Sequence, residues 1–332
     1  MKNRRLLGVI AAMVALVLVL AACGPGEDEF PSESITMQIP FPAGGPTDTE
    51  ARIVASHAEE ILGVSIIAEN VEGAGGTVAW DRVPDFATDG YEITLYNLPH
   101  IVANPKVRDV RFTLDSFDWI AHIGRDPNAV IVRQDSEFET LDDLIAAAEA
   151  DPGGITVGLA GLWLAHHFTA LNLQDAAGID LREQPFAGTA PGMTALLGGH
   201  VDVFVSNVSD VVRTGDDVRA IAVAAEERSP FLPDVPTFIE QGIDWVISSD
   251  RGVAAPAGTD PDALAVLQEA FAEALEDPEL QATFEEVGAA MHILTTTEEI
   301  DAYISEVEEQ IDRVLAGLDP DLIEEEFQEQ LP

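Results

Sequence analysis

The sequence contains little cysteine and little lysine. One cysteine occurs among its 332 residues, so the chain cannot form an internal disulfide bond. Lys106 is the only lysine after Lys2, and the 16 basic residues face 60 acidic ones, which gives a net charge of −44 at pH 7. This excess of negative charge argues against nucleic acid and anionic lipid headgroups as partners.

Motifs of common enzymes are also missing. The chain has no P-loop, no Gly-x-Ser-x-Gly, no zinc-protease helix and no kinase signature, and Gly73-Ala74-Gly75-Gly76 lacks the third glycine of a dinucleotide-binding loop. His166 and His167 are adjacent, so they leave a helix on different sides, which favours a structural role over a metal site. We therefore expect no cofactor, no metal and no enzymatic activity. An enzyme on the same fold is the less favoured alternative, because catalytic groups can converge from distant loops.

The acidic residues are spread over nearly every segment, while hydrophobic residues still make up 47% of the chain. A disordered acidic tract would lack the periodic apolar segments seen here, so the composition indicates a folded protein. At molar salt the Debye length falls to roughly 3 Å, which weakens the repulsion between like charges. We interpret the composition as a halophilic adaptation.

The first residues have the pattern of a secretory signal peptide. Basic residues at positions 2, 4 and 5 precede an apolar stretch of 15 residues at 6–20, which is shorter than the roughly 20 residues that span a bilayer as a helix. The segment Leu20-Ala21-Ala22-Cys23 resembles a bacterial lipobox. We therefore expect residues 1–22 to be cleaved, Cys23 to be lipidated, residues 23–33 to form a tether, and the folded part to begin near Ser34. An ordinary buried thiol at Cys23 is the alternative.

Short β-type runs alternate with helical patterns along the rest of the chain, which favours an α/β protein with parallel sheets. The predicted strands are residues 35–39, 65–68, 91–96, 119–123, 129–132, 156–159, 201–205 and 220–224. A capping box at Thr140 predicts a helix up to residue 150, Asp260-Pro261 opens another, and an apolar stripe over residues 300–314 predicts a third. About 300 residues suffice for one large domain or two smaller ones.

The segment Pro40-Phe41-Pro42-Ala43-Gly44-Gly45-Pro46-Thr47-Asp48 leaves a predicted strand and enters a predicted helix. Gly44 and Gly45 let main-chain N–H groups approach a ligand, and the helix adds the positive end of its dipole. The loop therefore suits an anion. Alternatively, Thr47 or Asp48 simply caps the helix.

This loop and six later motifs resemble, in the same order, the Bug-type receptors of tripartite tricarboxylate transporters, a family with periplasmic-binding-protein folds. The later motifs are Gly73-Ala74-Gly75-Gly76, Asp89-Gly90-Tyr91, Pro185-Phe186-Ala187-Gly188, Leu197-Gly198-Gly199-His200-Val201-Asp202, Glu227-Arg228-Ser229-Pro230 and Pro233-Asp234-Val235-Pro236-Thr237-Phe238. The resemblance covers the chain from about residue 35 to residue 315.

The resemblance implies two α/β domains that face each other across a ligand cleft and are joined by a two-strand hinge. The strands at residues 129–133 and 248–253 match the two crossovers. Domain 1 is then expected to comprise residues 34–130 and 251–332, and domain 2 residues 131–250. Closure about the hinge would sequester the ligand and create the surface that the transporter recognises.

The resemblance also implies which residues bind the ligand. The first wall of the cleft is expected to contain Phe41, Ala43, Gly44, Gly45, Thr47 and Asp48. The second wall is expected to contain Ala160, Gly161, Trp163, Leu164, Gly188, Thr189, Ser206 and Asn207. Ser206 and Asn207 follow a predicted strand, and strand ends are where open α/β sheets bind ligands.

Trp163 and Leu164 stand where the family often has glycine and serine. They remove a hydroxyl group and add an aromatic plane to the second wall. We therefore hypothesise one anionic and one more apolar subsite, which together suit an aromatic or otherwise partly apolar carboxylate. The alternative is that Trp163 packs beneath the loop.

The resemblance thus predicts a monomeric solute-binding lipoprotein outside the cytoplasm, anchored to the membrane through Cys23. It would capture a small organic carboxylate and deliver it to one large and one small integral-membrane subunit of the transporter. A receptor that presents its ligand to a sensor kinase is the alternative.

Overall fold

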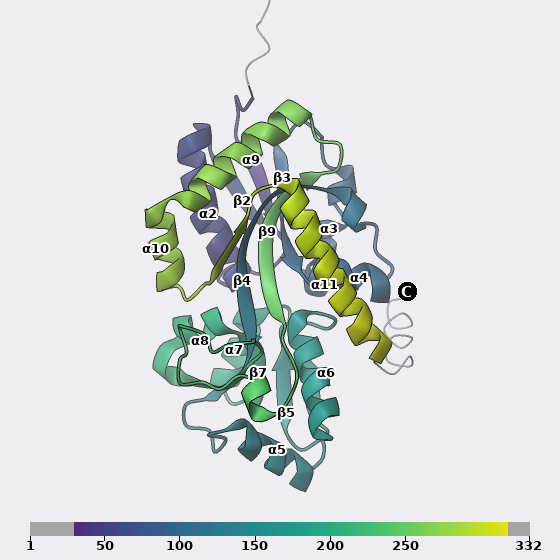
Figure 1. Cartoon of the computed structure of the whole chain (residues 1–332), viewed down its shortest axis with the longest axis vertical. Helices are drawn as coiled ribbons and strands as arrows, with labels where there is room; N and C mark the ends of the chain where they lie inside the picture. Colours follow the sequence, from purple (N-terminus) through teal and green to yellow (C-terminus); the bar gives the residue numbers. More distant parts are fainter. Residues whose placement is uncertain (1–29, 318–332) are drawn as a thin grey trace, which may run out of the picture.

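The computed structural model describes residues 30–317 and shows two α/β domains, one above the other in Figure 1. The chain passes between them twice, within strand β4 (Phe117–Arg133) and at the start of strand β9 (Ser248–Pro256). These two strands pair along the middle of the molecule (Figure 1). The predicted signal peptide and Cys23 lie outside the described residues. Within residues 30–317, no helix combines the length and the apolar character needed to cross a membrane.

Domain 1 is built on a mixed sheet with the strand order β2-β1-β3-β9-β4, and β10 pairs with β4. The further strands are β1 (Ile35–Ile39), β2 (Ile66–Asn70), β3 (Glu92–Leu98) and β10 (Met291–Leu294). Along β9, Val253 and Ala255 join one hydrophobic cluster and Ala254 joins another, because successive side chains of a strand point to opposite faces. Helices therefore cover both faces of the sheet.

One face of this sheet is covered by α2 (Pro46–Leu62), α9 (Pro261–Glu276) and α10 (Pro278–Glu286). The other face is covered by α3 (Thr77–Trp80), α4 (His100–Val107) and α11 (Thr297–Gly317). The long helix α11 runs diagonally from domain 1 toward domain 2 (Figure 1).

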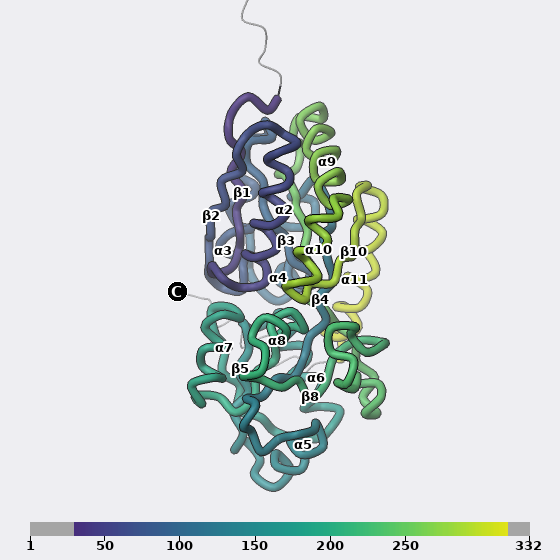
Figure 2. The backbone as a smooth tube through the Cα atoms, turned by 90° about the vertical axis from the view of Figure 1, so that its left-hand side faces the viewer, coloured from purple at the N-terminus to yellow at the C-terminus, as the bar shows by residue number. Residues whose placement is uncertain are grey.

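Domain 2 has a second sheet with the order β6-β5-β7-β4, and β8 also pairs with β4. Its own strands are β5 (Thr156–Leu159), β6 (Arg182–Pro185), β7 (Val203–Asn207) and β8 (Val218–Val223). Its helices are α5 (Leu141–Ala150), α6 (Ala165–Ala177), α7 (Thr189–Leu197) and α8 (Val208–Thr214). In the side view, α7 and α8 lie directly beneath domain 1 (Figure 2).

The prediction of parallel sheets is correct for the outer strands and wrong for the hinge. β1 runs parallel to β2 and β3, and β5 runs parallel to β6 and β7. In contrast, β4 runs antiparallel to β7, β8, β9 and β10. β6 and β10 are missing from the predicted strands, because neither has an alternating apolar pattern.

β4 is one strand of 17 residues where the sequence predicts two. The polar run Gly124-Arg125-Asp126-Pro127-Asn128 separates the two predicted strands, but it stays extended, paired with β9 up to Pro127 and with β7 from Asn128 onward. Proline lacks an N–H group for a sheet, and Pro127 lies where β4 changes partners. β4 therefore changes from the sheet of domain 1 to the sheet of domain 2 between Pro127 and Asn128, close to the predicted boundary at residues 130/131.

Two predicted helix starts are confirmed in detail. Thr140 Oγ1 accepts a hydrogen bond from Asp143 N (3.2 Å), and Asp143 Oδ2 accepts one from Thr140 N (2.9 Å), which completes the capping box of α5. α9 begins at Pro261, and Asp260 caps it by accepting hydrogen bonds from Asp262 N and Ala263 N.

The folded part begins before Ser34. The ring of Phe30 packs edge-to-face on Tyr91, with centroids 5.0 Å apart, and Ser32 N donates to Tyr91 Oη (2.9 Å). Residues 30–33, predicted as the end of the tether, are therefore attached to domain 1.

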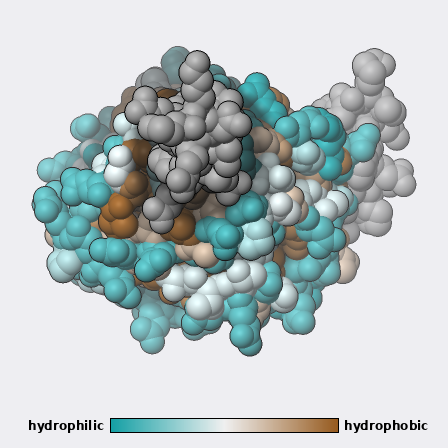
Figure 3. All heavy atoms as spheres, turned by 90° about the horizontal axis from the view of Figure 1, so that it is seen from above, coloured by the Kyte–Doolittle hydropathy of each residue, from teal (hydrophilic) through white to brown (hydrophobic). Residues whose placement is uncertain are grey.

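Seen from above, the molecule is largely hydrophilic, with scattered hydrophobic side chains, in line with its acidic composition (Figure 3).

Candidate functional site

A small cavity of about 30 Å³ lies between the two domains. Domain 1 lines it through the loop before α2, and domain 2 through the loops before α6, α7 and α8. The predicted site residues that line it are Phe41, Gly45, Thr47, Ala160, Leu164, Gly188, Thr189 and Asn207. The volume is enough for about two water molecules. An organic ligand therefore needs the domains to stand farther apart than they do here.

Three residues of the predicted first wall shape the loop and do not line the cavity. Asp48 Oδ2 accepts a hydrogen bond from Gly44 N (2.9 Å), and Asp48 Oδ1 accepts from Arg52 Nε and Asn70 Nδ2 (both 2.9 Å). Gly44 has a φ of +82°, which glycine adopts at low cost. Ala43 and Gly44 thus form a turn that Asp48 braces. The N-cap of α2 is Gly45, so the alternative in which Thr47 or Asp48 caps the helix is wrong.

Trp163 does not line the cavity either. It is 3% exposed and packs edge-to-face on His167 and Phe168, with centroids 5.2 and 6.3 Å away. Trp163 N also donates to His167 Nδ1 (3.0 Å). The alternative, in which Trp163 packs beneath the loop, therefore describes the structure. Leu164 is the member of the pair that faces the cavity.

Gly161 and Ser206 support neighbouring elements. Gly161 has a φ of +143°, and a Cβ atom built on it would lie 2.9 Å from Leu164 Cδ1, so glycine is required for this turn. Ser206 Oγ donates a hydrogen bond to the carboxylate of Asp210 at the start of α8. Neither residue is part of the cavity lining.

The cavity is also lined by buried polar residues that no sequence motif indicates, namely Asn97, His100, His166, Ser249 and Arg251. They come from β3, α4, α6 and β9, so no short motif contains them. Asn97 and His100 lie at the carboxyl end of β3. Because open α/β sheets bind ligands at such strand ends, this position was the one sequence feature that could have identified them as site residues. His166 was predicted to be structural, but it faces the cavity.

Three of these side chains have a buried polar atom without a hydrogen-bond partner in the described part of the chain. These atoms are Asn97 Oδ1, His100 Nδ1 and His166 Nδ1. Leaving such atoms unpaired costs about 1 to 3 kcal/mol each. A bound ligand or water molecules in the cavity would supply the missing partners.

The two cavity histidines are neutral at pH 7. Burial lowers the pKa of His166 to about 4, although the hydrogen bond that its ring shares with Asn207 Oδ1 opposes this shift. Burial likewise lowers the pKa of His100 well below its ordinary value. A neutral imidazole can either donate or accept a hydrogen bond. These side chains therefore add polarity to the cavity without adding charge.

Adjacent histidines do point in different directions, as the sequence predicts. His166 Nε2 lies 3.1 Å from Asn207 Oδ1, whereas His167 Nε2 lies 3.2 Å from Glu183 Oε2. In the part of the chain from residue 30 to residue 317, no group of three His, Cys, Asp or Glu residues is placed to hold a metal ion.

Several helices begin at the cavity. Gly45, Leu164, Gly188 and Asn207 are the N-caps of α2, α6, α7 and α8, and all four line it, together with His100, the first residue of α4. The N-terminus of a helix carries a partial positive charge and unpaired N–H groups. Convergence of these N-termini makes the cavity suitable for an anion.

Arg251 is the cation at the cavity and is 2% exposed. Its Nη1 donates to Glu50 Oε1 (2.7 Å) and to Asp126 Oδ2 (3.1 Å), and its Nε lies 3.4 Å from Thr47 Oγ1. Burial raises the pKa of Glu50 to about 7, against the opposing effect of Arg251. Burial also raises the pKa of Asp126. The guanidinium group is thus shared by two buried carboxyl groups.

The domains touch at the rim of the cavity. Arg213 of domain 2 donates from Nη1 to Thr49 Oγ1 (3.1 Å) and Gly44 O (3.4 Å) of domain 1. A Cβ atom built on Gly188 would lie 3.0 Å from Pro42 Cδ. These contacts between loops of the two domains describe a closed conformation.

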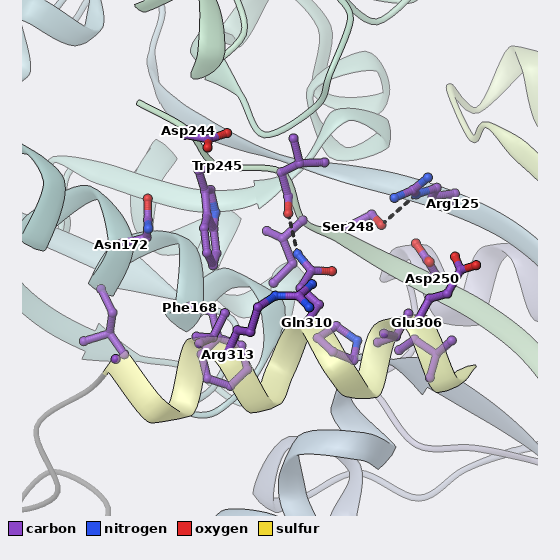
Figure 4. Close-up of a pocket in the computed structure, with 18 of the residues that line it drawn as sticks. Arg125, Phe168, Asn172, Asp244, Trp245, Ser248, Asp250, Glu306, Gln310 and Arg313 are labelled. Carbon is purple, nitrogen blue, oxygen red and sulfur yellow. Dashed lines mark hydrogen bonds between the residues drawn. The ribbon is translucent and has the colours of Figure 1, made fainter. Parts of the chain in front are cut away.

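A larger cavity of about 760 Å³ lies on the other side of the hinge (Figure 4). Ser248 and Asp250 of β9 line this rear cavity, whereas Ser249 and Arg251 line the cavity between the domains. Alternate residues of a strand point to opposite faces, so β9 separates the two cavities. Trp245, Phe168 and residues of α11 complete the rear cavity (Figure 4).

The sequence profile of the family described as "Tripartite tricarboxylate transporter family receptor" matches residues 50–316. The protein BugT of Bordetella pertussis is 31% identical over 302 residues, which cover 89% of this chain and 92% of BugT.

Solved structures show the same similarity. MatC of Rhodopseudomonas palustris, solved with bound malate, superposes with a TM-score of 0.77 and 29% identity, over 86% of this chain and 99% of MatC. The R. palustris protein Rpa4515, solved with adipate, superposes with a TM-score of 0.81 and 25% identity, over 86% of this chain and 97% of Rpa4515.

Proposed function

The chain belongs to the tripartite tricarboxylate transporter receptor family, and we propose that it is an extracytoplasmic solute-binding lipoprotein that delivers a small organic carboxylate to such a transporter. The observation that carries this proposal is the convergence of the N-termini of α2, α4, α6, α7 and α8 on one interdomain cavity. The receptor acts as a monomer and is not an enzyme.

Anion binding has to overcome the net charge of −44. Helix N-termini and loop N–H groups act at contact distance, where they stabilise a carboxylate directly. The remote surface carboxylates act over many ångströms and are screened by salt. The local donors therefore dominate in the high-salt environment that the composition indicates.

The ligand we propose is a carboxylate with an apolar portion. Phe41, Ala160 and Leu164 give the cavity apolar surface, while Asn97 and His166 offer unpaired polar atoms. MatC and Rpa4515 were solved with the dicarboxylates malate and adipate. The proposed apolar subsite contains Leu164 and not Trp163. Either a linear or a ring-bearing acid could pack against the side chain of Leu164.

Opening and closing of the domains supports capture and release. The closed cavity leaves room for about two water molecules, so ligand entry requires rotation about β4 and β9. In a closed, liganded receptor the two domains together form an outer surface that differs from that of the open receptor. The membrane subunits would bind the closed form.

Isothermal titration calorimetry in high-salt buffer tests the proposed ligand class, with malate, adipate, phenylacetate and neutral or cationic amino acids as probes. We expect at least one carboxylate to bind, and amides of the same acids to bind at least about tenfold more weakly, since they lack the charge that the helix N-termini stabilise. Preference for a cationic or uncharged solute would overturn the proposal.

The lipid anchor is tested separately with the full chain in a bacterial host. We expect the wild type to incorporate labelled palmitate and to remain with the membrane fraction, and Cys23→Ser to do neither. An unlabelled wild-type protein would contradict the lipoprotein part of the proposal without affecting the ligand part.

A further inference from the structure

We infer that Arg251 receives the carboxylate of the ligand and that Glu50 binds a proton when this carboxylate enters, an inference that rests on the proposed function. Arg251 lines the interdomain cavity, while Glu50 lies behind it at the other end of their ion pair. The cleft would then take up an acid as an anion together with one proton.

The first step is the balance of charge around the guanidinium group. The charged side chains that face Glu50 are Arg251 from β9, Asp126 from β4, and Asp210 and Arg213 from α8. With all acids ionised, this cluster holds two cations and three anions. A ligand carboxylate would add a fourth anion in a region of low dielectric constant, where like charges repel strongly. Uptake of one proton by the cluster compensates the negative charge that the ligand carboxylate adds.

The second step identifies the group that takes the proton. Asp126 Oδ1 accepts from Ser209 N (3.2 Å), and Asp126 Oδ2 accepts from Ser209 Oγ (2.6 Å) and from Arg251. Both oxygens of Asp210 also accept hydrogen bonds, from Arg213 and from Ser206. Both oxygens of each of these carboxyl groups thus have a hydrogen-bond donor.

Glu50 differs from these two carboxylates. Its side chain is 2% exposed; Oε1 accepts from Arg251, but Oε2 is buried and has no hydrogen-bond partner in the described part of the chain. An ionised carboxylate with an unpaired buried oxygen is costly, and protonation relieves this cost. Burial accordingly raises the pKa of Glu50 to about 7, so a modest additional negative charge suffices to protonate it near neutral pH.

The third step is the consequence for Arg251. When Glu50 is ionised, two carboxylates neutralise the guanidinium group. When Glu50 is protonated, Asp126 is the one ionised carboxylate that remains paired with Arg251. The guanidinium face toward the cavity can then pair with a ligand carboxylate, which favours bidentate geometry with arginine. Glu50 thus determines how strongly Arg251 attracts an anion.

Calorimetry of malate, adipate and phenylacetate with the full mature chain tests this inference. We expect affinity to rise as the pH falls from about 8.5 to about 6, by up to tenfold per pH unit above the pKa of Glu50. At about pH 7.5, titrations in buffers with different ionisation enthalpies should show net proton uptake of up to about one proton per bound acid.

Glu50→Gln keeps an oxygen that accepts from Arg251 and resembles the protonated acid. We expect this variant to bind the same acids with an affinity that no longer changes over this pH range, and without proton uptake. Glu60→Gln, an exposed substitution on the same helix, is the matched control and should retain both properties of the wild type.

Arg251→Gln alone would leave two buried carboxylates without their cation and endanger folding. In the Glu50→Gln/Arg251→Gln double variant only Asp126 loses its cation, and Ser209 still donates two hydrogen bonds to it. The double variant should bind the acids at least about tenfold more weakly than Glu50→Gln, because the cation is missing.

The outcomes separate the inference from the proposed function. Acids that bind without proton uptake, with the same pH dependence in wild type and Glu50→Gln, would overturn the inference and leave the function standing. Failure of every carboxylate to bind would overturn both.

Discussion

Gly45 of domain 1 and Thr189 of domain 2 meet across the closed cleft, since a Cβ atom built on Gly45 would lie 3.3 Å from Thr189 Oγ1. Gly45 has an extended backbone with φ −79° and ψ 171°, which alanine adopts without strain. Substitution at this position therefore affects domain closure and leaves the loop conformation intact.

We expect Gly45→Ala to shift the ligand-free receptor toward an open conformation and to increase its radius of gyration, because the added Cβ atom crowds Thr189 Oγ1 only when the domains are closed. Its melting temperature without ligand should stay close to that of the wild type. Small-angle X-ray scattering and thermal melts measure the two effects. Gly317→Ala, with no atom within 4 Å of the added Cβ, is the control. A radius of gyration equal to that of the wild type would contradict the role of this contact in domain closure.

Arg213→Gln should shift the receptor toward an open conformation. Arg213 Nη1 donates to Thr49 Oγ1 (3.1 Å) across the rim, and this contact exists in the closed form. Its loss should lower ligand affinity by about threefold to tenfold and increase the radius of gyration in small-angle X-ray scattering. Arg228→Gln removes an exposed ion pair with Glu240 inside domain 2 and should change neither quantity.

Stability should fall in acid because of His122. Burial, with smaller effects from His292 and Arg125, lowers the pKa of His122 to about 3. The unfolded chain therefore binds this proton at a higher pH than the folded chain does. The contribution to stability is present above pH 6.5 and is lost as the pH falls toward 3. It amounts to about 3 kcal/mol between pH 7 and pH 4.

Urea unfolding at these two pH values measures the effect. His122→Asn should show a smaller loss of unfolding free energy in acid than the wild type does. His200→Asn, at an exposed position, is the control and should behave as the wild type. An equal loss in all three proteins would show that His122 is not responsible.

Removal of salt should destabilise the protein, because 60 acidic residues then repel one another with little screening. Between about 2 M and about 0.1 M sodium chloride, we expect a loss of about 3 kcal/mol, which is on the order of 10 °C in melting temperature. Sucrose at matched osmolality controls for effects of water activity. A melting temperature that does not depend on salt would contradict the halophilic interpretation.

Leu164 and Trp163 should differ in their effect on ligand preference. Leu164→Ser removes apolar surface from the cavity and should weaken phenylacetate binding by about tenfold while leaving malate nearly unchanged. Trp163→Phe keeps the packing on His167 and Phe168 and should change neither affinity by more than about twofold. Competition calorimetry with the two acids measures both. A larger loss of phenylacetate affinity in Trp163→Phe than in Leu164→Ser would show that Trp163 contacts the ligand.

The sequence was sufficient for most of the helices and strands and for the loop of domain 1 that lines the cavity. The capping box at Thr140 and the strand at residues 35–39 depend on neighbouring residues, so local pattern reveals them. The glycine-rich loop before α2 was recognised for the same reason. Its Gly45 and Thr47 do line the cavity.

The rest of the cleft depends on contacts between distant segments. Arg251 is 201 residues from Glu50 and 125 from Asp126, and no local pattern announces that a hinge strand brings them together. The continuity of β4 was missed because Arg125-Asp126-Pro127 looks like a turn, although β9 pairs with it throughout. The orientation of Trp163 likewise follows from packing against α6, which sequence spacing does not specify.

β9 separates the interdomain cavity from the rear cavity by turning Arg251 to one side and Asp250 to the other. The strand pair β4 and β9 therefore lies on the hinge axis, with one cavity on each side of it. When two rigid bodies rotate about such an axis, their surfaces draw apart behind it as they approach in front. The rear cavity should thus become wider when the cleft closes on a ligand, so the outer surface of the receptor differs between the open and the closed form.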